Sequence, residues 1–162
     1  MLQSLDIRQR WIFENQPIRG TAVFLDQTVQ KAFKAHPYSP DEKQWLAEAL
    51  LSAVLLGGIG KQSGKILLQF QGSGDIRLLS AQATQSGYVR AVLQTQAGQV
   101  GEQALERGTL GVIYQPDVVS QHYQSIVEAM SGGLMPSLEH YFEQSEQILT
   151  RIQCFEQDGR YA

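Results

Sequence analysis

Residues 65–83 read KILLQFQ-GSGD-IRLLSAQA and contain two short apolar runs joined by a glycine-rich turn. Within the runs, apolar residues tend to recur with a period of two, the spacing of a β-strand with one buried face. The turn, Gly72-Ser73-Gly74-Asp75, links the two runs as a hairpin connection does. The stretch therefore predicts a pair of neighbouring antiparallel strands.

The same pattern continues toward the C-terminus. Further strands are predicted over residues 88–94, 109–115 and 123–130, with Ser86-Gly87 as the next turn. Ser131-Gly132-Gly133 then opens a last helix, whose apolar residues have helical spacing: Leu134, Leu138, Tyr141 and Phe142. Residues 151–155 are predicted to form another strand.

Toward the N-terminus the pattern predicts one strand and two helices. Residues 21–25 have strand-forming composition, and Asp26 is placed to cap a short helix that ends at His36-Pro37. Ser39-Pro40-Asp41-Glu42 is a strong start for a second helix, which ends at Gly57-Gly58. Apolar residues between 45 and 56 cover more than one face of that helix, which is typical of a buried helix or a subunit interface. The predicted fold class is α+β, a mostly antiparallel β-sheet packed with a few helices in a single domain.

Composition excludes several classes of protein. The chain has 162 residues, of which 43% are hydrophobic and 18% charged, and a formal net charge of −3. This charge favours neither nucleic acid nor an anionic membrane as a partner. Asp6, Arg8 and Arg10 occupy the region where a signal peptide needs an apolar run, and no stretch is long and apolar enough to span a membrane. We therefore expect a soluble, cytoplasmic protein.

Nucleotide-binding motifs fail on their spacing. The glycine-rich stretch 57–65 has Leu55 and Ile59 where a phosphate loop needs a glycine five residues before its Gly-Lys pair. A dinucleotide fingerprint would need glycine or alanine at Ser63 or Arg77. Both glycine clusters are read as turns, and no cofactor is expected.

No catalytic or metal-binding set is apparent. His36, His122 and His140 are the only histidines, and their spacing is not that of metal ligands. His36 is interpreted as a partner for a helix end. Cys154 is the single cysteine, which excludes an intramolecular disulfide or a cysteine-cluster zinc site in these residues. Alternation in RIQCF places Cys154 and Ile152 on one face, so Cys154 is interpreted as a buried structural thiol.

Asp158-Gly159 is a strong hairpin-turn signal, yet only three residues follow it. A hairpin without a returning strand leaves a row of backbone groups unpaired. We therefore expect that the natural chain is longer than these residues.

Three ordered motifs resemble one family. They are RWIFEN (10–15) followed by Ile18-Arg19-Gly20, the run 66–74 ending in Gly72-Ser73-Gly74, and YFEQSEQ (141–147) followed by Thr150-Arg151. On these motifs the chain resembles the redox-regulated heat-shock holdases, also called the thirty-three-kilodalton chaperonin. It departs from the family pattern in the glycine-rich stretch 57–65 and over residues 91–108.

The resemblance implies an ATP-independent chaperone that binds unfolding client proteins and works as a homodimer. Residues 1–162 would be its N-terminal client-binding and dimerisation domain. The family's C-terminal zinc-binding cysteine cluster, which acts as a redox switch, is absent from this sequence, and Cys154 matches none of its ligands. Dimer contacts are expected from the C-terminal segment or the 45–56 helix, while the client-binding surface stays unassigned.

Two other hypotheses stay open. The chain could be a dimerisation scaffold without holdase activity of its own. It could also be an enzyme of unrecognised type that uses Cys154 or a histidine.

Overall fold

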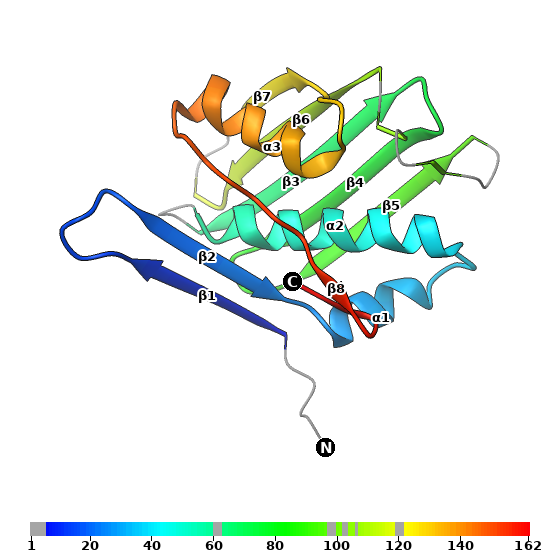
Figure 1. The fold of residues 1–162 in the computed structure, drawn as a ribbon, viewed down its shortest axis with the longest axis horizontal. Helices are drawn as coiled ribbons and strands as arrows, with labels where there is room; N and C mark the ends of the chain where they lie inside the picture. Colours follow the sequence, from blue (N-terminus) through cyan, green and yellow to red (C-terminus); the bar gives the residue numbers. More distant parts are fainter. Residues whose placement is uncertain (1–5, 60–62, 97–99, 102–103, 106, 119–121) are drawn as a thin grey trace.

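The computed structural model describes residues 6–59, 63–96, 100–101, 104–105, 107–118 and 122–162. Its centre is a five-stranded sheet in the order β5-β4-β3-β6-β7, with every neighbouring pair antiparallel. The strands are β3 (Gly64–Gly72), β4 (Ile76–Thr84), β5 (Val89–Thr95), β6 (Gly108–Pro116) and β7 (Tyr123–Glu128). The predicted α+β class is confirmed, and the predicted hairpin of residues 65–83 forms β3 and β4 (Figure 1).

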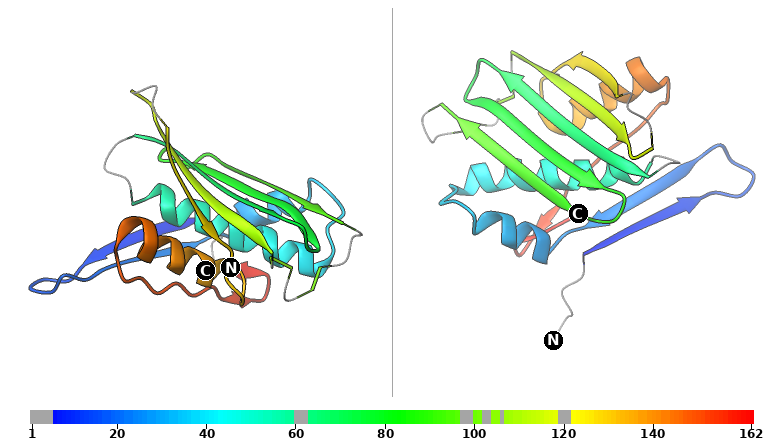
Figure 2. Two further views of the ribbon diagram at one scale, coloured as in Figure 1. Left: turned by 90° about the horizontal axis from the view of Figure 1, so that it is seen from above. Right: turned by 180° about the vertical axis from the view of Figure 1, so that it is seen from behind.

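One face of this sheet carries the core, and the helices lie on that face (Figures 1 and 2). In the register, Leu68 lies between Ala81 and Val112, and all three side chains are buried. Phe70 lies two residues further along β3, on the same face as Leu68. Its ring occupies the space that side chains at Gly72 and Gly108 would need. A Cβ at Gly108 would come within 2.3 Å of that ring, so the position requires glycine.

Helix α2 (Pro40–Gly57) is the main helix against the sheet, with α3 (Leu134–Tyr141) beside it. The Ser39 hydroxyl accepts from the Glu42 N–H at 3.2 Å, and the Glu42 carboxylate accepts from the Ser39 N–H at 2.9 Å. This reciprocal capping box confirms the predicted start. Sheet residues cover one side of α2, while β2, α1 and the C-terminal segment cover another. The apolar faces of α2 are therefore buried within the chain, which is one of the two predicted alternatives, and a role of α2 in a dimer stays a prediction.

Helix α1 (Gln27–Phe33) begins where predicted, but its cap is not Asp26. The carboxylate of Asp6 accepts from the backbone N–H of Asp26 at 2.7 Å and of Thr28 at 3.1 Å, and it accepts from the Thr28 hydroxyl. Asp26 itself has helical backbone angles and makes no side-chain cap bond. The predicted cap is therefore wrong, because the free N–H groups at the start of the helix donate to a carboxylate 20 residues earlier in the sequence.

Strands β1 (Ile7–Ile12) and β2 (Arg19–Phe24) form a separate antiparallel ribbon that projects from the body of the domain (Figure 1). The sequence predicted strand character for 21–25 only, so β1 was missed. Phe13 continues the pairing, since its N–H donates to the carbonyl of Ile18 at 3.1 Å.

The predicted strand over 123–130 ends at Glu128. The Ala129 N–H still bonds to the Gly108 carbonyl at 3.0 Å, but the Met130 N–H donates to the Ser137 hydroxyl at 2.9 Å. The chain thus leaves the sheet to begin α3, as predicted from residues 131–133. A single π-helical turn (Phe142–Glu146) follows α3, and Gln147 ends it in the left-handed region.

Residues 151–155 are extended but form no strand, and among them only Phe155 pairs with another extended residue, Ala162, so the predicted strand is wrong. The segment crosses α2 instead (Figure 1), and its alternation reflects packing on helices. After it come β8 (Glu156–Gln157) and β9 (Arg160–Tyr161), joined by Asp158 and Gly159 at φ values of 53° and 75°. The predicted turn is confirmed. The expected row of unpaired groups is wrong for residues 160–162, because Tyr161 also bridges to Leu25 and Ala162 pairs with Phe155.

Candidate functional site

The β1–β2 ribbon has two chemically different faces. Cross-strand pairing places Arg8 opposite Val23 and Arg10 opposite Thr21, so these side chains share one face. That face docks on the C-terminal end of α2. The Arg8 guanidinium donates to the Val54 carbonyl at 3.3 Å.

Arg10 donates to the Gly58 carbonyl at 2.8 Å, beyond the last turn of α2. The last turn of α2 contains no basic residue of its own, so the ribbon supplies the cations that a helix C-terminus favours. Gly58 permits the approach, since a Cβ there would lie 2.8 Å from the Arg8 side chain. The ribbon is therefore held to the body by its arginine face.

The opposite face of the ribbon is exposed and, apart from Gln9, apolar. Here the register pairs Ile7 with Phe24 and Trp11 with Gly20, and Phe13 with Ile18 extends the row. Exposed fractions run from 39% at Ile7 to 54% at Phe13 and Ile18. Scattered exposed apolar residues are ordinary, but these share one face of the ribbon. The pair Gln9 and Ala22 lies on the same face and separates Ile7 and Phe24 from the others. We call this set, Ile7, Trp11, Phe13, Ile18 and Phe24, the ribbon stripe.

The uncovered face of the large sheet differs from the ribbon stripe. Figure 2 shows that no helix covers this face. Its most exposed apolar strand residues are Val92 on β5 and Ile126 on β7, at opposite edges of the sheet. The row between them contains Ser80, Gln69 and Gly111. These exposed side chains are therefore separated from each other.

A cavity of about 310 Å³ lies beside the ribbon. One wall is residues 21–24 of β2, the other is residues 152–155, and Ala162 lies at its edge. Its remaining lining comes from helices α2 and α3: Leu51, Ser52, Leu55, Met135 and Leu138. We call this cavity the slot. Its volume lies at the lower end of the range for cavities that hold ligands.

Cys154 lines the slot, as a half-buried thiol. Burial, together with the negative charge of Glu48, raises the pKa of this thiol to about 12. A thiol with that pKa is protonated at neutral pH, whereas a nucleophile or metal ligand needs the thiolate. The environment is thus that of a structural cysteine.

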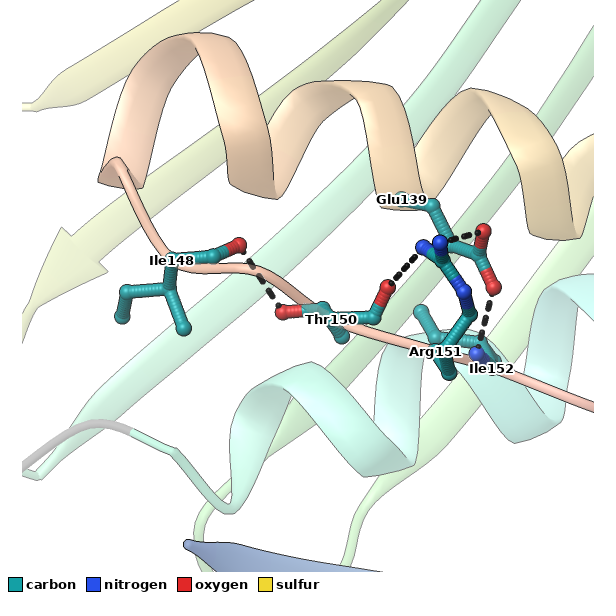
Figure 3. Close-up of polar contacts among 5 residues, drawn as sticks. All are labelled: Glu139, Ile148, Thr150, Arg151 and Ile152. Carbon is teal, nitrogen blue, oxygen red and sulfur yellow. Dashed lines mark hydrogen bonds and ion pairs between the residues drawn. The ribbon is translucent and has the colours of Figure 1, made fainter. Parts of the chain in front are cut away.

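Glu139 of α3 fixes the segment that forms the far wall of the slot. Its carboxylate accepts from the Ile152 N–H at 2.7 Å and faces the Arg151 guanidinium at 3.4 Å (Figure 3). The same guanidinium donates to the Thr150 carbonyl at 2.9 Å. The Thr150-Arg151 motif therefore positions a chain segment.

The YFEQSEQ motif also has a local structural role. The Tyr141 hydroxyl donates to the Glu146 carboxylate at 2.8 Å across the π-helical turn, and Ser145 bonds to Ser125 of β7. Burial and the Glu146 carboxylate both raise the pKa of the Tyr141 hydroxyl, which keeps it protonated as a donor. The motif holds the end of α3 against the sheet.

The three histidines lie apart in the fold. The His36 ring is edge-on to Tyr38 at 5.6 Å, His122 is 3.3 Å from the Gln115 amide, and His140 lies on α3. Within the described residues no group of three or more His, Cys, Asp or Glu side chains could hold a metal ion. Gly60, Lys61 and Gln62 of the glycine-rich stretch lie outside the described residues. No helix in the described part of the chain is both long and apolar enough to cross a membrane.

The fold and the ribbon stripe define an α+β domain with an exposed apolar surface on its projecting ribbon. The Hsp33 protein family matches residues 6–160, and the chain belongs to that family. The 33 kDa chaperonin of Hahella chejuensis is 35% identical over 158 residues, covering 95% of this chain and 55% of that protein. The 33 kDa chaperonin of Methylobacillus flagellatus is 31% identical, covering 93% of this chain and 53% of that protein.

The crystal structure of the 33 kDa chaperonin of Thermotoga maritima has the same fold, with a TM-score of 0.73 at 22% identity. The match covers 88% of this chain and 53% of that one. The chain spans about half the length of the curated relatives it matches.

Proposed function

We propose that this chain binds unfolding proteins and prevents their aggregation without ATP. The observation that carries this proposal is the ribbon stripe, which presents exposed aromatic and aliphatic side chains on one face of a ribbon anchored from its other face. The membership of the Hsp33 family and the chaperonin names of its relatives support the same proposal. The clients are partly unfolded polypeptides, recognised by their exposed apolar side chains.

The stripe suits weak and unselective binding. Each of its side chains is roughly half exposed, and burying the rest contributes about 1 kcal/mol per residue. The sum, about 5 kcal/mol before association costs, corresponds to a dissociation constant nearer millimolar than nanomolar for a single contact. Such affinity holds an aggregation-prone chain while it is unfolded and releases it when its apolar residues become buried.

The proposed activity does not depend on redox state in these residues. Cys154 is the single cysteine of the sequence, and its raised thiol pKa disfavours oxidation chemistry. We therefore propose that peroxide leaves binding by this chain unchanged, and that no metal takes part in it.

A second candidate is self-association through the same stripe. A two-fold contact between ribbon stripes would bury apolar surface and produce a homodimeric scaffold without client binding. The observation that favours it is that the stripe is exposed on a single chain while α2 and the C-terminal segment are engaged within the fold.

The test is suppression of thermal aggregation. A heat-labile enzyme is warmed with and without the purified chain, and light scattering is recorded without ATP, with ATP, and after peroxide treatment. We expect equal suppression in all three conditions at a severalfold molar excess of the chain. No suppression at any excess, together with a stable dimer in analytical ultracentrifugation, would establish the scaffold instead.

A further inference from the structure

One edge of β1 is free along the strand. In the ribbon, β1 pairs with β2 on one side, and among the described residues it pairs with no other segment. Figures 1 and 2 show no described element beyond it. The strand contains no proline, and its pairing with β2 has no bulge, so it lacks two of the devices that protect exposed edges. This edge can therefore accept a further strand through backbone hydrogen bonds.

The pairing with β2 determines which backbone groups face outward from this edge. The Phe13 N–H donates to the Ile18 carbonyl at 3.1 Å, so Phe13 and the alternate residues before it direct their backbone groups toward β2. Arg8, Arg10 and Ile12 therefore direct their N–H and C=O groups away from β2. We call these outward groups of Arg8, Arg10 and Ile12 the β1 edge.

The side chains along the β1 edge gather positive charge. Arg8 and Arg10 share one face of the ribbon, and Arg19 of β2 lies on the same face opposite Ile12. Each of the two β1 guanidinium groups donates through Nη1 to a carbonyl at the end of α2, and within the described residues neither forms an ion pair with a carboxylate. Their other nitrogens remain as donors for a carboxylate. Since the whole chain has a net charge of −3, this face is a local concentration of positive charge.

A second copy of β1 fits this edge poorly. Hydrogen bonds across it require outward-facing residues to lie opposite one another. An antiparallel self-pairing centred on Gln9 places Arg8 of each copy opposite Arg10 of the other, and one centred on Arg10 places the two Arg10 side chains opposite each other. Like charges directly opposite are destabilising. The occupant that matches the charge of this edge is a strand with acidic side chains.

The two faces of the ribbon specify the sequence pattern of such a strand. Side chains opposite Arg8 and Arg10 would lie on the arginine face, where carboxylates are complementary. The intervening side chains would lie beside Gln9 and Trp11 on the face of the ribbon stripe, where apolar groups add to an exposed apolar surface. Acidic and apolar residues that alternate with period two satisfy both faces at once.

We propose that the β1 edge binds an extended segment of an unfolding client in which acidic and apolar residues alternate, added antiparallel to β1 as the third strand of the ribbon. This inference rests on the proposed function and names the class of client segment that the ribbon prefers. Backbone hydrogen bonds hold the segment whatever its sequence, while the arginines select acidic residues and the ribbon stripe is extended by the apolar ones.

The probe is the peptide acetyl-VEVEVEV-amide, and the charge-reversed peptide acetyl-VKVKVKV-amide is its control. We expect the acidic peptide to slow amide hydrogen exchange at Arg8, Arg10 and Ile12, measured by NMR on the whole chain. At low salt the lysine peptide should bind about tenfold more weakly, because attractive cross-strand pairs become repulsive. At about 1 M salt this difference should disappear. Equal binding of the two peptides at low salt, or protection confined to other residues, overturns the proposal.

Backbone methylation tests strand addition separately from charge. In the proposed register the glutamates of the peptide direct their N–H groups toward β1, and the valines direct theirs away. Methylating the three glutamate nitrogens should weaken binding at least about tenfold, whereas methylating three of the valine nitrogens should change it little. Equal affinities of the two methylated peptides would overturn strand addition.

A protein variant tests the same edge. Ile12→Pro removes one outward N–H donor, and proline is tolerated on edge strands. It should weaken binding of the acidic peptide by up to about tenfold. The matched control is Ile126→Pro on the edge strand β7, where the Ala129 N–H faces β6 and the Ile126 N–H therefore faces away from it. With circular dichroism confirming that both variants are folded, equal binding by the two would contradict the assignment to β1.

Two levels of inference are separated by further outcomes. Protection of Arg8 and Arg10 that rises with protein concentration in the absence of peptide would show that a second copy occupies the edge, and would overturn the proposal. If the chain suppresses aggregation but the acidic peptide leaves the β1 edge unprotected, strand addition fails and the proposed function stands. If the peptide protects the edge but the chain suppresses no aggregation, the proposed function fails and the client role of the edge fails with it.

Discussion

The Arg10 guanidinium donates to the Gly58 carbonyl at 2.8 Å across 48 residues of sequence, and this contact joins the projecting ribbon to the end of α2. Arg8 makes a parallel contact to Val54 one turn earlier. Together they hold one face of the ribbon against the body, which leaves the ribbon stripe exposed on the other face. The anchoring arginines and the stripe alternate along the same six-residue strand.

Replacing both anchoring arginines should loosen the ribbon. We expect Arg8→Ala with Arg10→Ala to lower the free energy of unfolding by about 1–2 kcal/mol, since charged donors to helix-end carbonyls are lost. Amide exchange in β1 should accelerate more than exchange in β3. Urea unfolding and exchange measurements check this. Arg19→Ala, an exposed arginine on the same ribbon, is the control, and an equal effect there would contradict the anchoring role.

The cap of α1 offers a matched pair of substitutions. Asp6→Ala should destabilise the chain by about 1 kcal/mol because the N–H groups of Asp26 and Thr28 lose their acceptor. Asp26→Ala should change stability by only a few tenths of that, although the local sequence favours Asp26 as the cap. Thermal unfolding of the two variants distinguishes them, and the reverse order would show that Asp26 is the functional cap in solution.

Glu139 makes two contacts that should contribute differently to the free energy of unfolding: an ion pair with Arg151 and a hydrogen bond from the Ile152 N–H. Glu139→Gln removes the ion pair with Arg151, whose side chain is 76% exposed, and keeps an acceptor for the Ile152 N–H. We expect it to cost less than about 0.5 kcal/mol. Glu139→Ala removes the acceptor as well and should cost about 1–2 kcal/mol. Chemical denaturation measures both, and equal costs would mean that the Ile152 hydrogen bond contributes nothing.

The Cys154 thiol makes stability depend on alkaline pH. Its folded-state pKa of about 12 lies above the model-compound value of 9.0, so the folded state keeps its proton where the unfolded state loses it. The stabilisation is fully present below about pH 9 and is lost as the pH rises toward 12. Cys154→Ala should flatten this decline in urea unfolding between pH 8 and about 11, the remaining slope coming from buried tyrosines such as Tyr141.

The same thiol should react slowly with iodoacetamide in the native chain at pH 8 and rapidly in urea. The Cys154→Ala variant should suppress aggregation as well as the unsubstituted chain does. A loss of activity in that variant would revive the hypothesis of a cysteine-dependent enzyme.

Local sequence predicted the parts of the fold that are stabilised locally. The alternation in residues 65–83 is sufficient for β3 and β4, and the Ser39–Glu42 capping box is sufficient for the start of α2. The cap of α1 could not be predicted from local sequence, because its acceptor, Asp6, lies 20 residues away from Asp26.

The candidate site was harder to predict, although part of its signal is local. In IRQRWIF the apolar residues Ile7, Trp11 and Phe13 share one period-two face with Gln9, and Arg8 and Arg10 share the other with Ile12. This alternation indicates a strand with two different faces, but the partner of the arginines is a helix end far along the chain. Residues 151–155 led to a wrong prediction for a different reason. Apolar and polar residues alternate in the same way in a paired strand and in an extended segment packed on helices.

The most direct test of the central claim compares two pairs of substitutions in the aggregation assay. Trp11→Ser with Phe13→Ser disrupts the ribbon stripe, while Val92→Ser with Ile126→Ser removes exposed apolar side chains from the uncovered sheet face. With circular dichroism confirming that both variants are folded, we expect the first to lose most of the suppression of client aggregation and the second to keep it. Retention of full suppression by the stripe variant, or its loss in the sheet variant alone, would contradict the assignment of client binding to the ribbon.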